Sequence, residues 1–255
     1  MTRRVLVRSA LLALVASAAL ALAPLLPGPT SLDEYRVAAY VSHAAWFALV
    51  TALAWSVAVA WPAPMRLLLA GVALSFALVV VLNVADVDIA SDVAKLCFGS
   101  LAGVAFVRAI ERPWWLLPIF LLVPAADAWS VFSDQGVTNQ VVERARDEPR
   151  WIDWPTIASP VAGVDYEFLG RLGIVDVLFL ALMLAATVRW GLGIRRALVL
   201  LPTGLLLTTI LVIERPQDAL PALPLLCVAF LLATGPALVR DARAAWRETR
   251  PPADV

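Results

Sequence analysis

Residues 171–186 read RLGIVDVLFLALMLAA, an apolar stretch that carries a single acidic residue, Asp176. Placing a charged carboxylate in the hydrocarbon core costs about 2.5–3.5 kcal/mol on insertion scales. Ionisable residues kept at this depth usually belong to substrate sites, ion sites or proton pathways. The stretch therefore predicts a membrane-embedded helix with a functional carboxylate.

The composition of the whole chain indicates a polytopic membrane protein. Of its 255 residues, 62% are hydrophobic and 16% are charged, whereas soluble domains carry about a quarter charged residues. Apolar runs of about twenty residues recur along the chain, and no polar stretch is long enough to fold separately. We therefore expect one domain over residues 1–255, in a multi-pass protein of the cell membrane. The net charge of zero gives no electrostatic argument for a nucleic-acid partner.

The apolar runs predict an all-α bundle with eight transmembrane helices. We expect them at residues 5–27, 37–61, 66–85, 93–110, 114–132, 168–189, 195–213 and 220–239. A loop at 133–167 separates the N-terminal helices (1–132) from the C-terminal helices (168–255). Its first part, 137–148, is polar and helix-prone, and its proline-rich second part, 149–163, should be extended.

The basic residues predict the orientation of the bundle. With eight spans, 13 of the 20 Lys and Arg residues fall on the side that holds both termini. The positive-inside rule then places the termini inside and the 133–167 loop outside. The segment Ala21-Leu22-Ala23 resembles a signal-peptide cleavage site, but we expect a retained first helix because its apolar run is long.

The sequence offers no cluster of metal-ligating residues. Cys97 and Cys227 lie apart in apolar segments, and His43 is the only histidine. We expect no metal and no cofactor. An acidic cluster between the third and fourth predicted helices, interpreted as a solvated turn, is formed by Asp86, Asp88 and Asp92.

Two aspartates, Asp127 and Asp176, are predicted at hydrocarbon depth in helices that flank the 133–167 loop. These helices are consecutive, so they run antiparallel and can be neighbours. Two carboxyls that approach closely in a low dielectric share one proton, which allows one to act as a base and the other as an acid. This chemistry suits aspartyl proteolysis. A proton or cation pathway, or a structural role with Ser, Thr or Arg partners, is also compatible with the two aspartates.

Three further motifs resemble those of the presenilins and signal peptide peptidases, the GxGD-type intramembrane aspartyl proteases. Residues 171–176, RLGIVD, are similar to the motif around the second catalytic aspartate of the family. Residues 127–132, DAWSVF, and the polar segment 141–149 that follows, are similar to the region of the first catalytic aspartate in microbial members. Residues 221–224, PALP, match the Pro-Ala-Leu motif at the start of the last helix.

This resemblance implies a presenilin-like fold and an intramembrane aspartic endopeptidase whose catalytic pair is Asp127 and Asp176. The substrates would be transmembrane-helix proteins or peptides, met within the membrane lipid. The residues implied to shape the substrate site are Gly173, Val175, Pro221, Ala222 and Leu223. By similarity to the family, residues 156–168 would hold an unwound substrate by strand addition.

The chain departs from the family motifs at two positions. Val175 replaces the second glycine of the GxGD motif, and Ala126 replaces the tyrosine that precedes the first aspartate. The chain also has one predicted span fewer than the family. A relative that binds transmembrane helices without cleaving them is therefore an alternative to an active protease. Arg171 could act on Asp176 or simply anchor the helix at the interface.

Overall fold

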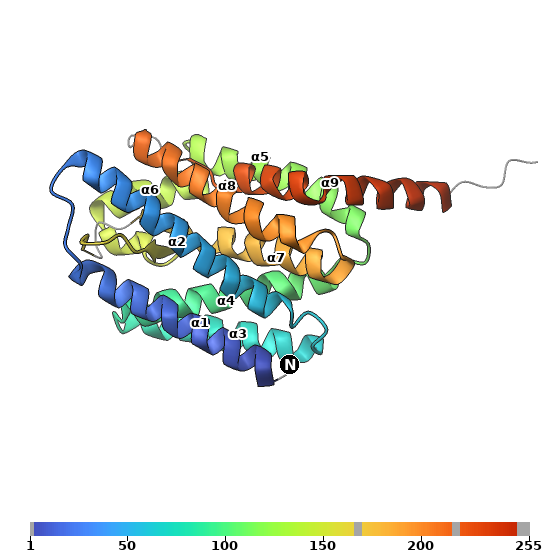
Figure 1. Cartoon of the computed structure of the whole chain (residues 1–255), viewed down its shortest axis with the longest axis horizontal. Coiled ribbons are helices and arrows are strands. Elements are labelled where there is room, and N and C mark those ends of the chain that lie inside the picture. Colours follow the sequence, from blue (N-terminus) through green and yellow to red (C-terminus); the bar gives the residue numbers. More distant parts are fainter. Residues whose placement is uncertain (1–2, 166–169, 216–219, 249–255) are drawn as a thin grey trace, which may run out of the picture.

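Long apolar helices form most of the structure, a computed structural model that describes residues 3–165, 170–215 and 220–248 (Figure 1). The eight long helices are α1 (Arg3–Leu22), α2 (Leu32–Ala58), α3 (Met65–Val84), α4 (Asp88–Ala109), α5 (Leu116–Phe132), α7 (Ile174–Trp190), α8 (Ile194–Glu214) and α9 (Leu223–Glu248). In the described residues, seven helices are long and apolar enough to cross a membrane. The predicted all-α polytopic bundle is confirmed.

The predicted helix bounds agree with the structure only in part: α1 ends at Leu22 and not at residue 27, and α2 and α4 each begin five residues earlier than predicted. The polar segment expected to be helical is α6 (Val137–Asp147). The helix expected from residue 168 is α7, which begins only at Ile174. Its 17 residues leave it outside the seven membrane-length helices, whereas α5 is counted among them as part of the longer stretch Pro113–Ala145. The last helix, α9, begins at Leu223 and continues to Glu248, beyond the predicted end at 239.

Helix α7 lies at the centre of the bundle. Every residue from Leu180 to Thr187 is at most 1% exposed, and α7 packs against α4, α2 and α8. A helix that is apolar on all sides is stable where other helices cover it. By contrast, α3 presents exposed apolar side chains such as Leu74 and Val81 on its outer face, where lipid would cover them.

A short antiparallel hairpin precedes α7 and lies at the same end of the bundle as α6 (Figure 1). It consists of β1 (Thr156–Ser159) and β2 (Gly170–Gly173), with Thr156 opposite Gly173 and Ser159 opposite Gly170. The prediction that residues 149–163 are extended is only partly correct, because this segment begins with a 3₁₀ helix, η3 (Pro149–Ile152). Residues 166–168 of the predicted strand-addition segment lie outside the described residues.

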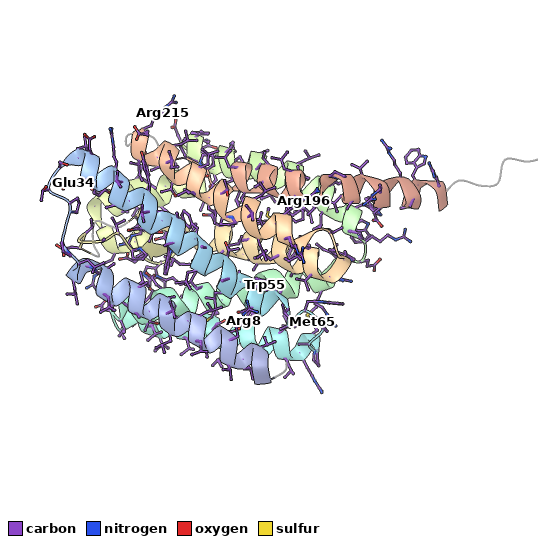
Figure 2. All side chains as sticks on the ribbon, viewed as in Figure 1. Arg8, Glu34, Trp55, Met65, Arg196 and Arg215 are labelled. Atoms are coloured by element: carbon purple, nitrogen blue, oxygen red, sulfur yellow. The ribbon has the colours of Figure 1, made fainter. Side chains whose placement is uncertain are left out.

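The opposite end of the bundle holds both described ends of the chain and several arginines (Figure 2). The Arg8 guanidinium of α1 lies 4.2 Å from the ring centroid of Trp55 on α2. Arg189, at the end of α7, donates to the carbonyls of Val107 and Ile110, which end α4. Arginine near a helix C-terminus complements the carbonyls that have no partner within the helix.

Candidate active site

Asp127 lies on α5, five residues before the helix ends at Phe132. Its Oδ2 atom accepts a hydrogen bond of 3.1 Å from the backbone N–H of Leu223, the first residue of α9. The first N–H groups of a helix have no partner within the helix, so an approaching carboxylate is stabilised there. This contact brings the Pro-Ala-Leu segment directly to Asp127.

Asp176 is the third residue of α7. The helix predicted from residue 168 would place Asp176 about nine residues from its start, which is wrong because residues 170–173 form β2 instead of helix. Glycine has a low helix propensity, and this strand begins and ends with Gly170 and Gly173. The Asp176 Oδ2 atom accepts the backbone N–H of Gly173 at 3.0 Å. Each aspartate is thus held by a backbone N–H from one of the two motif segments.

The carboxyls of Asp127 and Asp176 lie close enough to interact electrostatically, and both side chains are half-buried. The chain order suggested that α5 and α7 can be neighbours, but they are not each other's main neighbours. Among the described residues α5 packs chiefly against α9, and α9 in turn contacts α7. The N-terminal end of α9 therefore helps to bring the two aspartates to one site.

Two of the five other predicted site residues donate hydrogen bonds to the aspartates. Gly173 and Leu223 supply the N–H groups just described. Pro221 and Ala222 immediately precede Leu223 and are half-buried, whereas Leu223 is buried. Val175 is 54% exposed, so its side chain lies on the accessible surface next to Asp176 in the sequence and takes no part in the core.

Gly173 is also tightly placed against the Asp176 side chain. A Cβ atom at position 173 would lie 2.9 Å from Oδ2 of Asp176. This distance is shorter than real Cβ contacts, so any larger residue would displace the carboxylate. The glycine of the motif therefore has a direct geometric reason in this structure.

The register of the hairpin determines which backbone groups point outward. Ile174 donates its N–H to the carbonyl of Pro155 at 2.9 Å. In an antiparallel pair the bonded positions alternate, so the backbone groups of Ala158 and Gly173 point away from the partner strand. Accordingly, the Gly173 N–H reaches Asp176, and the Ala158 N–H reaches α4. The β1 edge is covered by α4, and the β2 edge lies beside Asp176.

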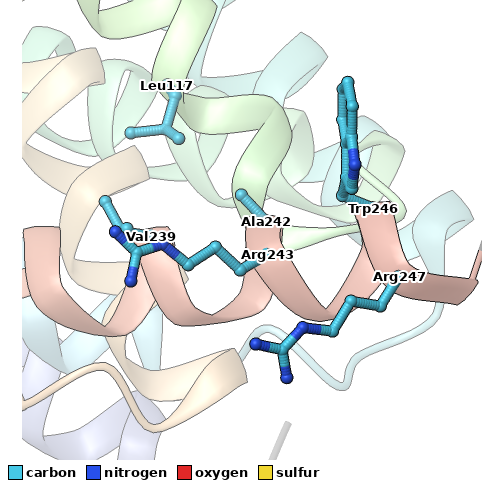
Figure 3. Close-up of a pocket in the computed structure, with 6 residues that line it drawn as sticks. All are labelled: Leu117, Val239, Ala242, Arg243, Trp246 and Arg247. Carbon is cyan, nitrogen blue, oxygen red and sulfur yellow. The ribbon is translucent and has the colours of Figure 1, made fainter.

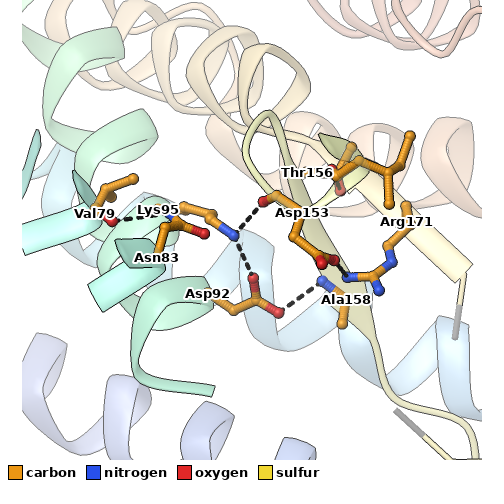
Figure 4. Close-up of polar contacts among 9 residues, drawn as sticks. Val79, Asn83, Asp92, Lys95, Asp153, Thr156, Ala158 and Arg171 are labelled. Carbon is orange, nitrogen blue, oxygen red and sulfur yellow. Dashed lines mark hydrogen bonds and ion pairs between the residues drawn. The ribbon is translucent and has the colours of Figure 1, made fainter. Parts of the chain in front are cut away.

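A buried ion pair on α4 holds the hairpin in place (Figure 4). Lys95 Nζ lies 3.0 Å from Asp92 Oδ1 and also donates to the backbone carbonyl of Asp153. Asp92 Oδ2 accepts the Ala158 N–H of β1 at 2.9 Å. The Asp153 carboxylate pairs with the Arg171 guanidinium of β2 at 2.8 Å. A charged network thus connects α4 to both strands next to Asp176.

This network corrects two interpretations of the sequence. The acidic cluster is not a uniformly solvated turn, because Asp92 is fully buried, although Asp88 is exposed. Asp86 is exposed and pairs with Arg150, and this pairing raises the pKa of the Arg150 guanidinium. Arg171 has Asp153 as an ion-pair partner, so it acts on the hairpin and not solely as an anchor at the interface.

A close contact between α4 and α7 was missed in the sequence. Gly99 and Gly103 are four residues apart on α4, and both face α7. A Cβ atom at Gly103 would lie 2.7 Å from the backbone nitrogen of Leu182. Small residues at this spacing let two helix backbones approach closely in membranes. The GxxxG pattern of α4 could have predicted this packing, which positions α7, the helix that carries Asp176.

No group of three or more His, Cys, Asp or Glu side chains in the described residues is arranged to hold a metal ion. The two cysteines are unpaired, with Cys227 buried and Cys97 half-buried. The site therefore consists of a pair of carboxyls, two backbone donors and an adjacent strand edge.

A scan against protein-family models finds no match, and neither does a search of curated proteins.

Proposed function

We propose that this protein is an intramembrane aspartyl endopeptidase, which cleaves peptide bonds within transmembrane helices by means of Asp127 and Asp176. The observation that carries the proposal is the approach of these two carboxyls from α5 and α7. Each accepts an N–H from a segment whose sequence resembles the motifs of presenilin-type proteases. The fold proposed on this basis is presenilin-like.

The chemistry requires one protonated and one ionised carboxyl. The ionised carboxylate takes a proton from water as the water oxygen attacks the peptide carbonyl carbon. The protonated partner gives its proton to the carbonyl oxygen, which yields a neutral tetrahedral diol. The protonated carboxyl then donates to the leaving nitrogen as the C–N bond breaks, and the ionised carboxyl takes a proton from one diol hydroxyl. One carboxyl is therefore again protonated and the other ionised. The two aspartates act as one unit, so neither role is assigned to a single residue.

The hairpin supplies a place for the substrate backbone. A peptide bond in a transmembrane helix is hydrogen-bonded within the helix, so the helix must unwind before attack. An extended segment regains hydrogen bonds when it adds to a strand edge. Because α4 covers the edge of β1, β2 is the strand on which we place the substrate. The outward backbone groups of Arg171, the other non-bonded position of β2, would then align the substrate beside Asp176.

Cleavage of a helical reporter in liposomes tests the proposal. The purified full chain is reconstituted with a single-span peptide, and the products are identified by mass spectrometry. We expect cleavage inside the apolar span that is lost in Asp127→Asn and in Asp176→Asn. Asp134→Asn is the matched control, because Asp134 is an exposed carboxylate seven residues after Asp127.

Two outcomes would overturn the proposal. If no helical reporter is cleaved but the reporter is still captured by the protein, the chain is a binding relative without protease activity. If the liposomes show proton or cation flux that disappears with either aspartate substitution, and no cleavage occurs, the carboxyls serve an ion pathway.

A further inference from the structure

A groove lies at the far end of α9, away from the two aspartates (Figure 3). It has a volume of about 470 Å³ and lies where α9 passes the start of α5. Val239, Ala242 and Trp246 lie three and four residues apart, so they share one face of α9. Together with Leu117 of α5 they form the apolar wall of the groove.

Two arginines, Arg243 and Arg247, line the groove beside this wall (Figure 3). They are four residues apart on α9, and both are exposed. Within the described ranges, neither guanidinium forms an ion pair with an acidic side chain. Arg240 lies one turn earlier and adds a third exposed positive charge close to the same face of the helix.

The groove lies at the expected height of a membrane surface. The apolar part of α9, residues 223–239, spans about 25 Å at 1.5 Å per residue, close to the thickness of a hydrocarbon core. The arginines follow directly after it. Trp114 and Trp115 of η2 (Pro113–Trp115) lie next to Leu116, where α5 begins, and η2 contacts α9. Tryptophan and arginine are typical of the boundary between lipid and water.

We propose that this groove binds an anionic phospholipid. The phosphate would lie against the guanidinium groups of Arg243 and Arg247, which match phosphate oxygens in a bidentate geometry. An acyl chain would lie along Val239, Ala242 and Leu117. A soluble phosphate would use only the arginines, so the adjoining apolar wall favours a lipid. The predicted inside position of the C-terminus also faces the leaflet that is rich in anionic lipids.

Quenching of tryptophan fluorescence by brominated lipids tests this site in the full chain. Vesicles contain either brominated phosphatidylglycerol or brominated phosphatidylcholine, and Trp246→Phe isolates the signal of Trp246. We expect a preference for phosphatidylglycerol of about 30-fold at Trp246, from about 1 kcal/mol for each arginine. The preference should disappear in Arg243→Gln/Arg247→Gln and be reduced but still present in Arg243→Lys/Arg247→Lys, which keeps the charges but loses the bidentate geometry.

Arg215→Gln is the matched control, because Arg215 is an exposed arginine at the opposite end of the bundle (Figure 2). It should leave the preference unchanged. The proposal is overturned if the two lipids quench Trp246 equally, or if Arg215→Gln lowers the preference as much as the double variant. Displacement of the lipid by millimolar inorganic phosphate would also overturn it, because the ligand would then be a free anion.

Discussion

The buried ion pair of α4 gives the sharpest stability prediction. Lys95 is 1% exposed, and Asp92 is fully buried. Replacing Lys95 with Met keeps the size of the side chain but leaves the Asp92 carboxylate buried without its cation. Removing one partner of a buried pair typically costs about 3–5 kcal/mol, and we expect a loss of this size in the free energy of unfolding.

A second substitution separates the charge effect from other losses. In Asp92→Asn/Lys95→Met neither residue of the pair is charged, and the side-chain oxygen of Asn can still accept the Ala158 N–H. We expect the double variant to regain most of the stability, because a neutral pair has no uncompensated charge. Reversible unfolding by SDS in mixed micelles, followed by circular dichroism, measures the free energies.

The exposed ion pair between Arg150 and Asp86 provides the control. Its side chains are 76% and 52% exposed, so Arg150→Met should cost less than about 1 kcal/mol. The reasoning is refuted if Lys95→Met costs no more than Arg150→Met. It is also refuted if the double variant is less stable than Lys95→Met alone.

Three further predictions concern glycines and the start of α9. Gly103→Ala should cost about 1–3 kcal/mol in unfolding experiments, because its Cβ would press on the backbone of Leu182; Gly235→Ala, with open space around it, should cost nothing. Gly173→Ala should displace the adjacent carboxylate and lower reporter cleavage by about 10²-fold with unchanged stability, and normal cleavage would contradict the assigned contact. Leu223→Pro removes the N–H that binds the α5 carboxylate at a position where helices tolerate proline, so cleavage should fall below that of Leu223→Ala, and equal rates would refute a role for the N–H.

Helix positions could be predicted from the sequence wherever a long apolar run decided them. The spans of α3 and α8, and the polar helix α6, agree with the prediction to within one residue at each end. Local composition is enough in such segments, because a long apolar run has no alternative to a helix in lipid. The start of α7 was wrong because the glycines at 170 and 173 favour a strand that needs β1 as its partner.

The surroundings of the site could be predicted less well, because they depend on contacts between distant segments. Lys95 was visible at three residues after Asp92, but the Ala158 N–H that completes the network lies 66 residues further along the chain. Asp127 and Leu223 are 96 residues apart, and only the packing of α5 on α9 joins them. The resemblance of the motifs led to the same two aspartates, and their catalytic role stays a prediction.

The initial rate of reporter cleavage by four proteins tests the central claim most directly: the wild-type chain, Asp127→Asn, Asp176→Asn and the variant with both substitutions. If the carboxyls act as one unit, each single substitution should lower the cleavage rate to the background level, and the double substitution should not lower it further. A single variant that keeps the wild-type rate would contradict the account.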